Sequence, residues 1–240
     1  MNRRDLLKNA SLASGAVMFG ATFRPQSQQF VWETLPLLPN PATTAIEHIV
    51  VVTMENRSFD HFFGWFPNAD GKQAGLTYVD NSGISRSTHS LAGDNTGCPH
   101  PDPDHSYNGA RVEYDNGAMD GFLRAGSNDV FSIGYYGEAD IPFYAQLARN
   151  YTTCDRYFVS ILGPTFPNRL FLHAAQTDRL GDSTSFTSLP TIWDRLAQAG
   201  VSGNYYYSNV PFTALWGTKY VGISKLYDEF LTAAATGTLP

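Results

Sequence analysis

The sequence predicts an α/β fold in which helices flank a mostly parallel sheet. The expected elements alternate along the chain, which is typical of parallel sheets. They are a strand within residues 46–54, a helix over 142–149, a strand over 152–161, a helix over 170–176, a helix over 191–199 and a strand over 201–207.

An uninterrupted β-branched run supports the first strand. Ile49–Val52 has the composition of a strand buried on both faces of a parallel sheet. Ser58 then predicts the N-cap of a short helical turn over residues 59–63. Ligands bind at the carboxyl ends of such strands, so Glu55 and Asn56 occupy a position where chemistry is expected.

Helix boundaries support the later elements. Pro142 is suited to the first turn of a helix, and Gly200 is suited to end the helix over residues 191–199. Between the first strand and Pro142 lies a long irregular stretch, residues 67–139, rich in Gly, Asn, Asp and Ser. So long a loop inside a domain is usually functional or contains a small insert.

The N-terminal 24 residues have the pattern of an export signal. Arg3 and Arg4 precede a small, mildly apolar run with no charge until Arg24, which is typical of a twin-arginine signal. The alternative is a basic N-terminal helix of a cytosolic protein. Residues 25–45 contain four prolines and are predicted to be a linker. The sequence thus predicts a secreted, periplasmic or cell-surface protein.

Composition restricts the class of protein. Hydrophobic residues make up 42% of the 240-residue chain, which is enough for a core. Residues 25–240 retain 12 Lys or Arg and 21 Asp or Glu, a formal charge of −9, because residues 1–24 contain four of the 16 basic and one of the 22 acidic residues. With no basic cluster, nucleic-acid binding is not expected. Cys98 and Cys154 could pair outside the cytoplasm or remain free thiols.

Thr165 is the first candidate for chemistry. It lies between a predicted strand and a predicted helix, in a turn stiffened by Pro164 and Pro167. A helix N-terminus attracts phosphate and stabilises a developing alkoxide. The alternative is that Thr165 is only an N-cap. A hydroxyl nucleophile also needs a metal ion or a base to become reactive.

Three other residues could provide that help. Glu55 and Asn56 offer oxygen ligands for a divalent ion, although both could be ordinary surface residues. His105, in a loop with His100, Asp102 and Asp104, could contact phosphate, act as an acid or bind metal with Asp104; it could also be a solvated loop histidine. The motifs of serine hydrolases, P-loop NTPases and dinucleotide-binding folds are absent from the sequence.

Three ordered motifs resemble the bacterial phosphoesterase family, which contains secreted phosphatidylcholine-type phospholipases C and an acid phosphatase. The motifs are residues 55–60, residues 102–111 with 119–122, and residues 163–169; residues 191–196 are similar as well. The resemblance covers essentially all of residues 46–240, which we therefore take as the amino-terminal part of a phosphoesterase catalytic domain.

This resemblance implies an alkaline-phosphatase-like fold and hydrolysis of phosphate esters. By it, Thr165 is the nucleophile, Glu55 and Asn56 bind a divalent metal ion, and His105 contacts the phosphoryl group or acts as an acid. The expected substrate is a phospholipid, cleaved to diacylglycerol and a phosphorylated headgroup through a phosphothreonine intermediate. Peripheral contact with membrane lipid fits this function.

The sequence departs from the family pattern near its end. Further acidic and histidine ligands are expected downstream, but the sequence beyond Asp228 and Glu229 contains no Asp, Glu or His. We therefore expect an incomplete fold at the C-terminus and little hydrolase activity from the 240-residue chain alone. Two other functions stay open: an acid phosphatase that uses the same site, and a non-catalytic exported module that binds phosphate or lipid headgroups. The abundant aromatic residues, such as 205–207 and Trp216, could form a choline cage or simply belong to the core.

Overall fold

The computed structural model of the protein describes residue 43, residues 45–54 and residues 57–240. The predicted export signal and most of the predicted linker lie outside these residues. The chain divides at Glu47, and every helix and strand given below belongs to the unit His48–Pro240. Among the described residues, no helix is long and apolar enough to cross a membrane.

The strands of the described chain form three two-stranded sheets. β1 (Thr77–Val79) pairs antiparallel with β2 (Ser85–Ser87). The other two pairs are parallel: β3 (His89–Ser90) with β4 (Gly134–Tyr135), and β5 (Tyr205–Tyr207) with β6 (Ser224–Leu226). The mixture of helices and parallel strands agrees with the predicted α/β class. In the described part of the chain, however, no sheet grows beyond two strands.

Two of the predicted strands are wrong. Residues 45–54 have no regular secondary structure, and Ile49, Val51 and Val52 are each more than 70% exposed. Residues 152–161 are likewise irregular, and Tyr157 is 84% exposed. A β-branched run becomes a strand only when another strand completes its backbone hydrogen bonds. Within the described residues, neither run has such a partner. The third predicted strand, over 201–207, is confirmed only for its last three residues.

The helices agree better with the sequence. Ser58 caps α2 (Phe59–Phe63) by accepting a hydrogen bond from the His61 N–H. α4 (Pro142–Asn150) begins at its proline as predicted. α6 (Ile192–Gln198) is capped by Thr191, whose side chain and that of Asp194 each accept the other's backbone N–H.

α5 (Thr165–Ala174) begins five residues earlier than predicted. Pro167 is compatible with this start, because the N–H groups of a first helical turn have no partner inside the helix. Thr165 is therefore the first residue of α5. This position places its hydroxyl group at the positive end of the helix dipole.

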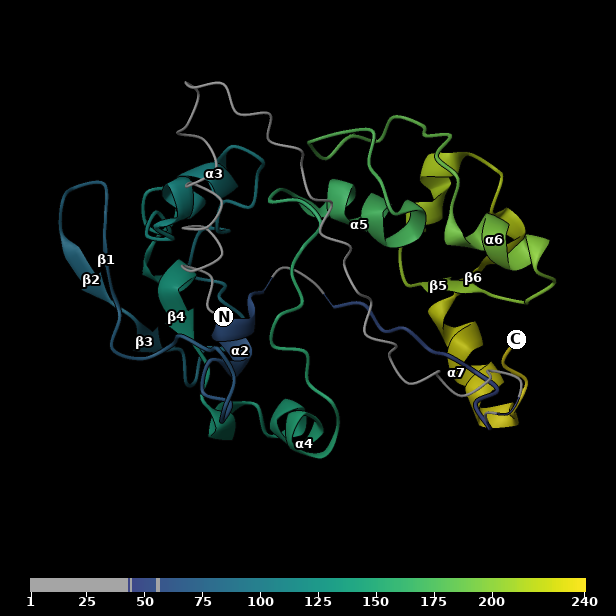
Figure 1. Ribbon diagram of the computed structural model, residues 1–240, viewed down its shortest axis with the longest axis horizontal. Helices are drawn as coiled ribbons and strands as arrows, with labels where there is room; N and C mark the ends of the chain where they lie inside the picture. The colour runs from purple at the N-terminus through teal and green to yellow at the C-terminus, as the bar shows by residue number, and fades with distance from the viewer. Residues whose placement is uncertain (1–42, 44, 55–56) are drawn as a thin grey trace, which may run out of the picture. The chain divides into compact units, whose positions relative to one another are not determined.

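The remaining elements are short, apart from the last helix. Figure 1 shows α7 against the β5–β6 pair, in agreement with the contacts between these elements. The elements are α3 (Gly109–Tyr114), α7 (Tyr227–Thr236) and the 3-10 helices η2 (Asp115–Gly117), η3 (Val130–Ile133), η4 (Glu138–Asp140), η5 (Phe212–Trp216) and η6 (Val221–Ile223).

Among the described residues, two hydrophobic clusters form the core. One is built on Leu170 of α5, which is fully buried, and on Phe212, Leu215, Trp216 and Tyr220. The other consists of Leu91, Phe131 and Tyr136. Trp216 is 6% exposed, and Tyr205 packs against the first cluster, so these two aromatic residues belong to the core rather than to a choline cage.

Candidate functional site

The turn that leads into Thr165 is held by side chains rather than by a sheet. The Asn168 side-chain amide donates to the carbonyl oxygens of Ile161, Gly163 and Pro164, each at 3.1 Å. Its Oδ1 also accepts from the Ile161 N–H at 3.4 Å. A residue in the first turn of α5 thus fixes the backbone just before that helix. The half-buried Thr165 is positioned by this arrangement.

Arg111, the third residue of α3, donates to the one carbonyl group of residues 161–164 that Asn168 does not bond. Its Nη1 donates to the Leu162 carbonyl oxygen at 2.8 Å and to the Tyr107 carbonyl oxygen at 2.5 Å. The guanidinium group also lies over the Tyr107 ring, 3.1 Å from its centre. All four carbonyl groups from residue 161 to residue 164 are therefore bonded by Asn168 or Arg111. Arg111 also connects this turn to the loop that carries His105.

The His105 loop is organised around Asp104. The Asp104 carboxylate accepts from the Ser106 N–H at 2.8 Å, and this bond lowers the pKa of Asp104. A Cβ atom on Gly109 would lie 2.3 Å from the Asp104 carboxyl carbon, and one on Gly126 would lie 2.7 Å from its Oδ2. The close approach of this carboxylate requires glycine at both positions. Asp104 thus has a structural role, which leaves His105 as the candidate for chemistry.

Asn128 links the same loop to Glu113 of α3. Its Oδ1 accepts from the Asp104 N–H at 2.5 Å, and its amide donates to Glu113 Oε1 at 3.2 Å. Burial raises the pKa of Glu113 to about 7. His105 itself is exposed, with Nδ1 2.9 Å from the Pro103 carbonyl oxygen and 3.9 Å from the Asp102 carboxylate. Its imidazole is therefore accessible to a ligand.

A cavity of about 510 Å³ brings these segments together. His105 lines it, as does Pro164, the residue immediately before Thr165. The remaining lining residues are Asp102, Pro103, Asp104, Ser106, Tyr107, Asn108, Gly126, Ser127, Leu180, Gly181 and Asp182. The structure thus brings the predicted acid and the turn of the predicted nucleophile to one cavity, although they are about sixty residues apart in the sequence.

The predicted metal ligands Glu55 and Asn56 lie outside the described residues. Among the residues that are described, no group of three His, Cys, Asp or Glu side chains is placed to hold a metal ion. These described residues alone do not fit a metal centre. Cys98 and Cys154 are both exposed free thiols, so the alternative without a disulfide is the one found.

Two other histidines belong to the core. His61 Nδ1 is 2.9 Å from the Gly134 carbonyl oxygen, and burial lowers the pKa of its ring. His173 Nδ1 accepts from Trp193 Nε1 at 3.2 Å, and burial lowers the pKa of His173 to about 4. Both rings are neutral near pH 7 and pack among aromatic side chains. They are structural residues.

Sequence reasoning missed the residues that position the site: Asn168, Arg111 and Asp182. Asp182 Oδ1 accepts from the Phe166 N–H at 2.8 Å, at the N-terminus of α5. Asn168 and Arg111 both fell inside motifs singled out above, but nothing in the sequence said which carbonyl groups they would reach. One signal could have found them: both are hydrogen-bond donors, and buried carbonyl groups of an irregular segment need donors of this kind.

Comparison with known proteins then identifies the family. Residues 46–237 match the model of the Phosphoesterase family. The chain belongs to the phosphoesterase family. Phospholipase C B of Mycobacterium tuberculosis is 32% identical over an alignment of 274 residues, covering 98% of this chain and 51% of the relative. Phospholipase C A of the same organism is 36% identical over 161 residues, covering 58% of this chain and 31% of the relative.

A plant relative is similar to the same chain. Non-specific phospholipase C6 of Arabidopsis thaliana is 31% identical over 222 residues, covering 81% of this chain and 42% of the relative. The chain thus spans about half the length, or less, of the curated relatives it matches. The predicted family membership is confirmed.

Proposed function

We propose that the protein takes part in phosphate-ester hydrolysis of the phospholipase C type, with Thr165 as nucleophile and His105 as acid. The observation that carries this proposal is the cavity lined by both His105 and Pro164. Family membership and the names of the relatives support the reaction class. Phosphatidylcholine-type phospholipid is the proposed substrate.

The proposed reaction has two displacements. Thr165 Oγ1 loses its proton to solvent and forms a bond to phosphorus, the bond from phosphorus to the diacylglycerol oxygen breaks, and protonated His105 gives that oxygen a proton. Water then forms a bond to phosphorus and loses a proton to His105, which restores the acid. The bond from phosphorus to Thr165 Oγ1 breaks, Thr165 takes a proton from solvent, and the phosphorylated headgroup is released. The dipole of α5 stabilises negative charge on the Thr165 oxygen, and the bonds from Asn168 and Arg111 keep that oxygen in place.

The divalent ion and the export route are part of the proposal. Carboxylate and amide oxygens such as those of Glu55 and Asn56 are suited to such an ion, which would supply charge neutralisation at phosphorus when bound. We propose that dialysis against a chelator lowers hydrolysis and that a divalent salt restores it. The twin-arginine pattern of residues 1–24 supports export across the cytoplasmic membrane.

A pair of variants tests the nucleophile. Thr165→Ala should abolish release of p-nitrophenol from p-nitrophenyl phosphorylcholine, whereas Thr165→Ser should retain part of it, because serine keeps the hydroxyl group. Mass spectrometry of acid-quenched protein should find the phosphoryl group on residue 165 of the parent. Equal hydrolysis by Thr165→Ala and the parent would contradict the assignment.

Two rival functions give different results in the same assays. An acid phosphatase would cleave p-nitrophenyl phosphate faster than p-nitrophenyl phosphorylcholine. A non-catalytic binding module would bind phosphorylcholine with no hydrolysis in the parent, and Thr165→Ala would bind it equally well.

A further inference from the structure

Asp182 places a negative charge beside the proposed nucleophile. Its Oδ1 accepts from the N–H of Phe166, the peptide group that follows Thr165, at 2.8 Å. Asp182 also lines the cavity that His105 lines. A phosphoryl group bonded to Thr165 would therefore lie near this carboxylate. Their mutual repulsion would depend on the charge of the phosphoryl group.

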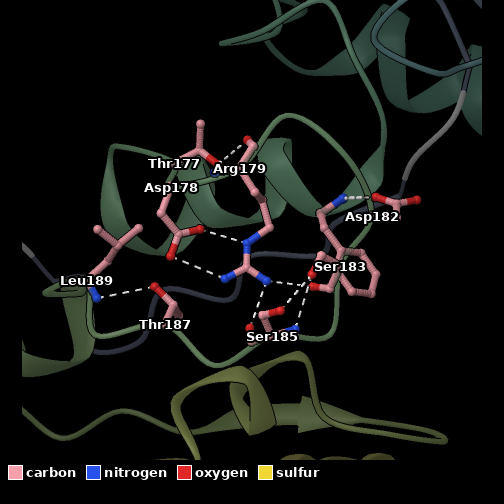
Figure 2. A network of polar contacts seen from close by, with 9 residues as sticks. Thr177, Asp178, Arg179, Asp182, Ser183, Ser185, Thr187 and Leu189 are labelled. Atoms are coloured by element: carbon pink, nitrogen blue, oxygen red, sulfur yellow. Dashed lines mark hydrogen bonds and ion pairs between the residues drawn. The ribbon is translucent and has the colours of Figure 1, made fainter.

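The loop that carries Asp182 is built around one buried arginine (Figure 2). The Arg179 side chain is only 10% exposed. Its Nε donates to Asp178 Oδ1 at 2.6 Å, and its Nη1 donates to the carbonyl oxygens of Ser183 and Ser185 at 2.5 and 2.8 Å. The backbone on the C-terminal side of Asp182 is thus fixed. This carboxylate cannot easily turn away from an approaching anion.

Apart from His105, which is positive when it carries the proton it donates, no residue that lines the cavity brings a charge that offsets Asp182. Among the described residues that line the cavity, none is Lys or Arg, and the other two carboxylates are those of Asp102 and Asp104. The Asp104 carboxylate is bonded to the Ser106 N–H. The Asp102 side chain is 83% exposed, so water screens its charge. Of these three carboxylates, Asp182 is the one that accepts from the peptide N–H next to Thr165.

We propose that Asp182 is a specificity-determining residue that favours phosphodiesters over phosphomonoesters. This inference rests on the proposed function and separates its two enzymatic forms. A phosphodiester carries one negative charge, whereas a phosphomonoester carries two at neutral or alkaline pH. The dianion therefore meets about twice the repulsion from a fixed carboxylate. The Phe166 N–H already donates to Asp182, so neither ester has free access to this donor. The two esters are alike in this respect, and the expected difference in their kcat/KM comes from their charge.

The test is Asp182→Asn, which removes the charge and keeps an oxygen that can accept from the Phe166 N–H. The measured quantity is the ratio of kcat/KM for p-nitrophenyl phosphate, a dianion at mildly alkaline pH, to kcat/KM for methyl p-nitrophenyl phosphate, a monoanion. We expect this ratio to rise roughly tenfold in Asp182→Asn, as expected for one charge pair near a protein surface. A merely structural role would lower both values together and leave the ratio unchanged.

Two matched variants control for loss of charge. Asp102→Asn removes a screened carboxylate of the same cavity and should raise the ratio by less than about twofold. Asp228→Asn removes an exposed carboxylate of α7 and should leave it unchanged. An equal rise in Asp182→Asn and Asp228→Asn would overturn the proposal, because the effect would then reflect net charge alone.

A binding measurement distinguishes failure of this inference from failure of the proposed function. Little turnover is expected of the 240-residue chain alone, and no turnover of either ester by the parent would refute hydrolysis by this chain. The specificity would then be measured by calorimetry with phenylphosphonate, a dianion, and its methyl monoester, a monoanion. A tenfold shift of the dissociation-constant ratio toward the dianion in Asp182→Asn supports the inference. An unchanged ratio, or no binding of either compound to the parent, overturns it.

Discussion

The segment before Thr165 and the segment before Glu55 are both predicted to be strands, but the backbone next to each candidate residue is held very differently. Each segment contains β-branched residues and leads to a candidate reactive group. In the turn before Thr165, Asn168 and Arg111 bond four consecutive carbonyl groups. Residues 45–54 are irregular, exposed and paired with no described strand. A reactive residue can therefore be positioned by side-chain donors where no strand forms.

The largest effect should come from the titration of His173, a buried residue of α5, the helix that starts at Thr165. His173 has a pKa of about 4 in the folded protein, below its ordinary value of 6.5. The unfolded chain therefore binds the proton more tightly, and stability is lost as pH falls from about 6.5 toward 4. We expect this loss to reach about 3 kcal/mol.

Urea denaturation from pH 7 to pH 4 would measure this loss. His173→Asn keeps an acceptor for Trp193 Nε1 and cannot titrate, so its stability should fall less steeply than that of the parent. Parallel curves for the two proteins would refute the buried neutral imidazole.

The hydrogen bonds of Asn168 to the turn before Thr165 should have the next largest effect, on the rate of hydrolysis. Asn168→Ala removes the partners of three carbonyl groups, and a shift of about 1 Å in Thr165 would lower kcat roughly 100-fold. Asn150→Ala is the matched control, because the Asn150 side chain bonds only within α4 at Gln146. The comparison would be broken if both variants hydrolysed p-nitrophenyl phosphorylcholine at the parent rate.

The opposite side of the cavity depends on close packing at Asp104. Gly109→Ala would bring a Cβ atom to 2.3 Å from the Asp104 carboxyl carbon, so the loop must shift. We expect a loss of about 1–3 kcal/mol in the free energy of unfolding. Gly222→Ala should be close to neutral, because nothing lies within 4 Å of its added Cβ. Guanidinium denaturation of the two variants measures the difference.

The smallest effect on stability should come from substitutions in the irregular, exposed residues 45–54. Val51 is 73% exposed, so Val51→Ser should change the free energy of unfolding by less than about 0.5 kcal/mol. A loss above about 1.5 kcal/mol by denaturant titration would show that this run is packed in solution, and the contrast with the Thr165 turn would disappear.

The starts of α2, α4 and α6 and the family could be predicted because their signals are local, whereas α5 begins five residues earlier than predicted. Ser58, Pro142 and Thr191 act through bonds or dihedral angles within one helical turn. The strands over residues 46–54 and 152–161 were wrong because pairing is non-local, and β-branched composition alone does not provide a neighbour. The roles assigned to Thr165 and His105 stay predictions, and those assigned to Glu55 and Asn56 lie outside the described residues.

The contribution of Arg111 could not be predicted for the same reason. Its bond to the Leu162 carbonyl oxygen spans 51 residues of sequence. The hydrogen bond that the Phe166 N–H donates to Asp182 Oδ1 spans 16 residues and depends on a loop shaped by Arg179. Such contacts depend on tertiary geometry. The composition and motif spacing of a single sequence do not show which distant residues will meet.

The two free thiols give the protein a built-in pair of attachment points for spectroscopic probes. Cys98 precedes the loop of His105, and Cys154 precedes the turn of Thr165; both are exposed. Nitroxide labels on these two residues would need no engineered cysteine. The distance distribution between the labels would report directly whether the acid and the nucleophile separate when a phosphate ester enters the cavity.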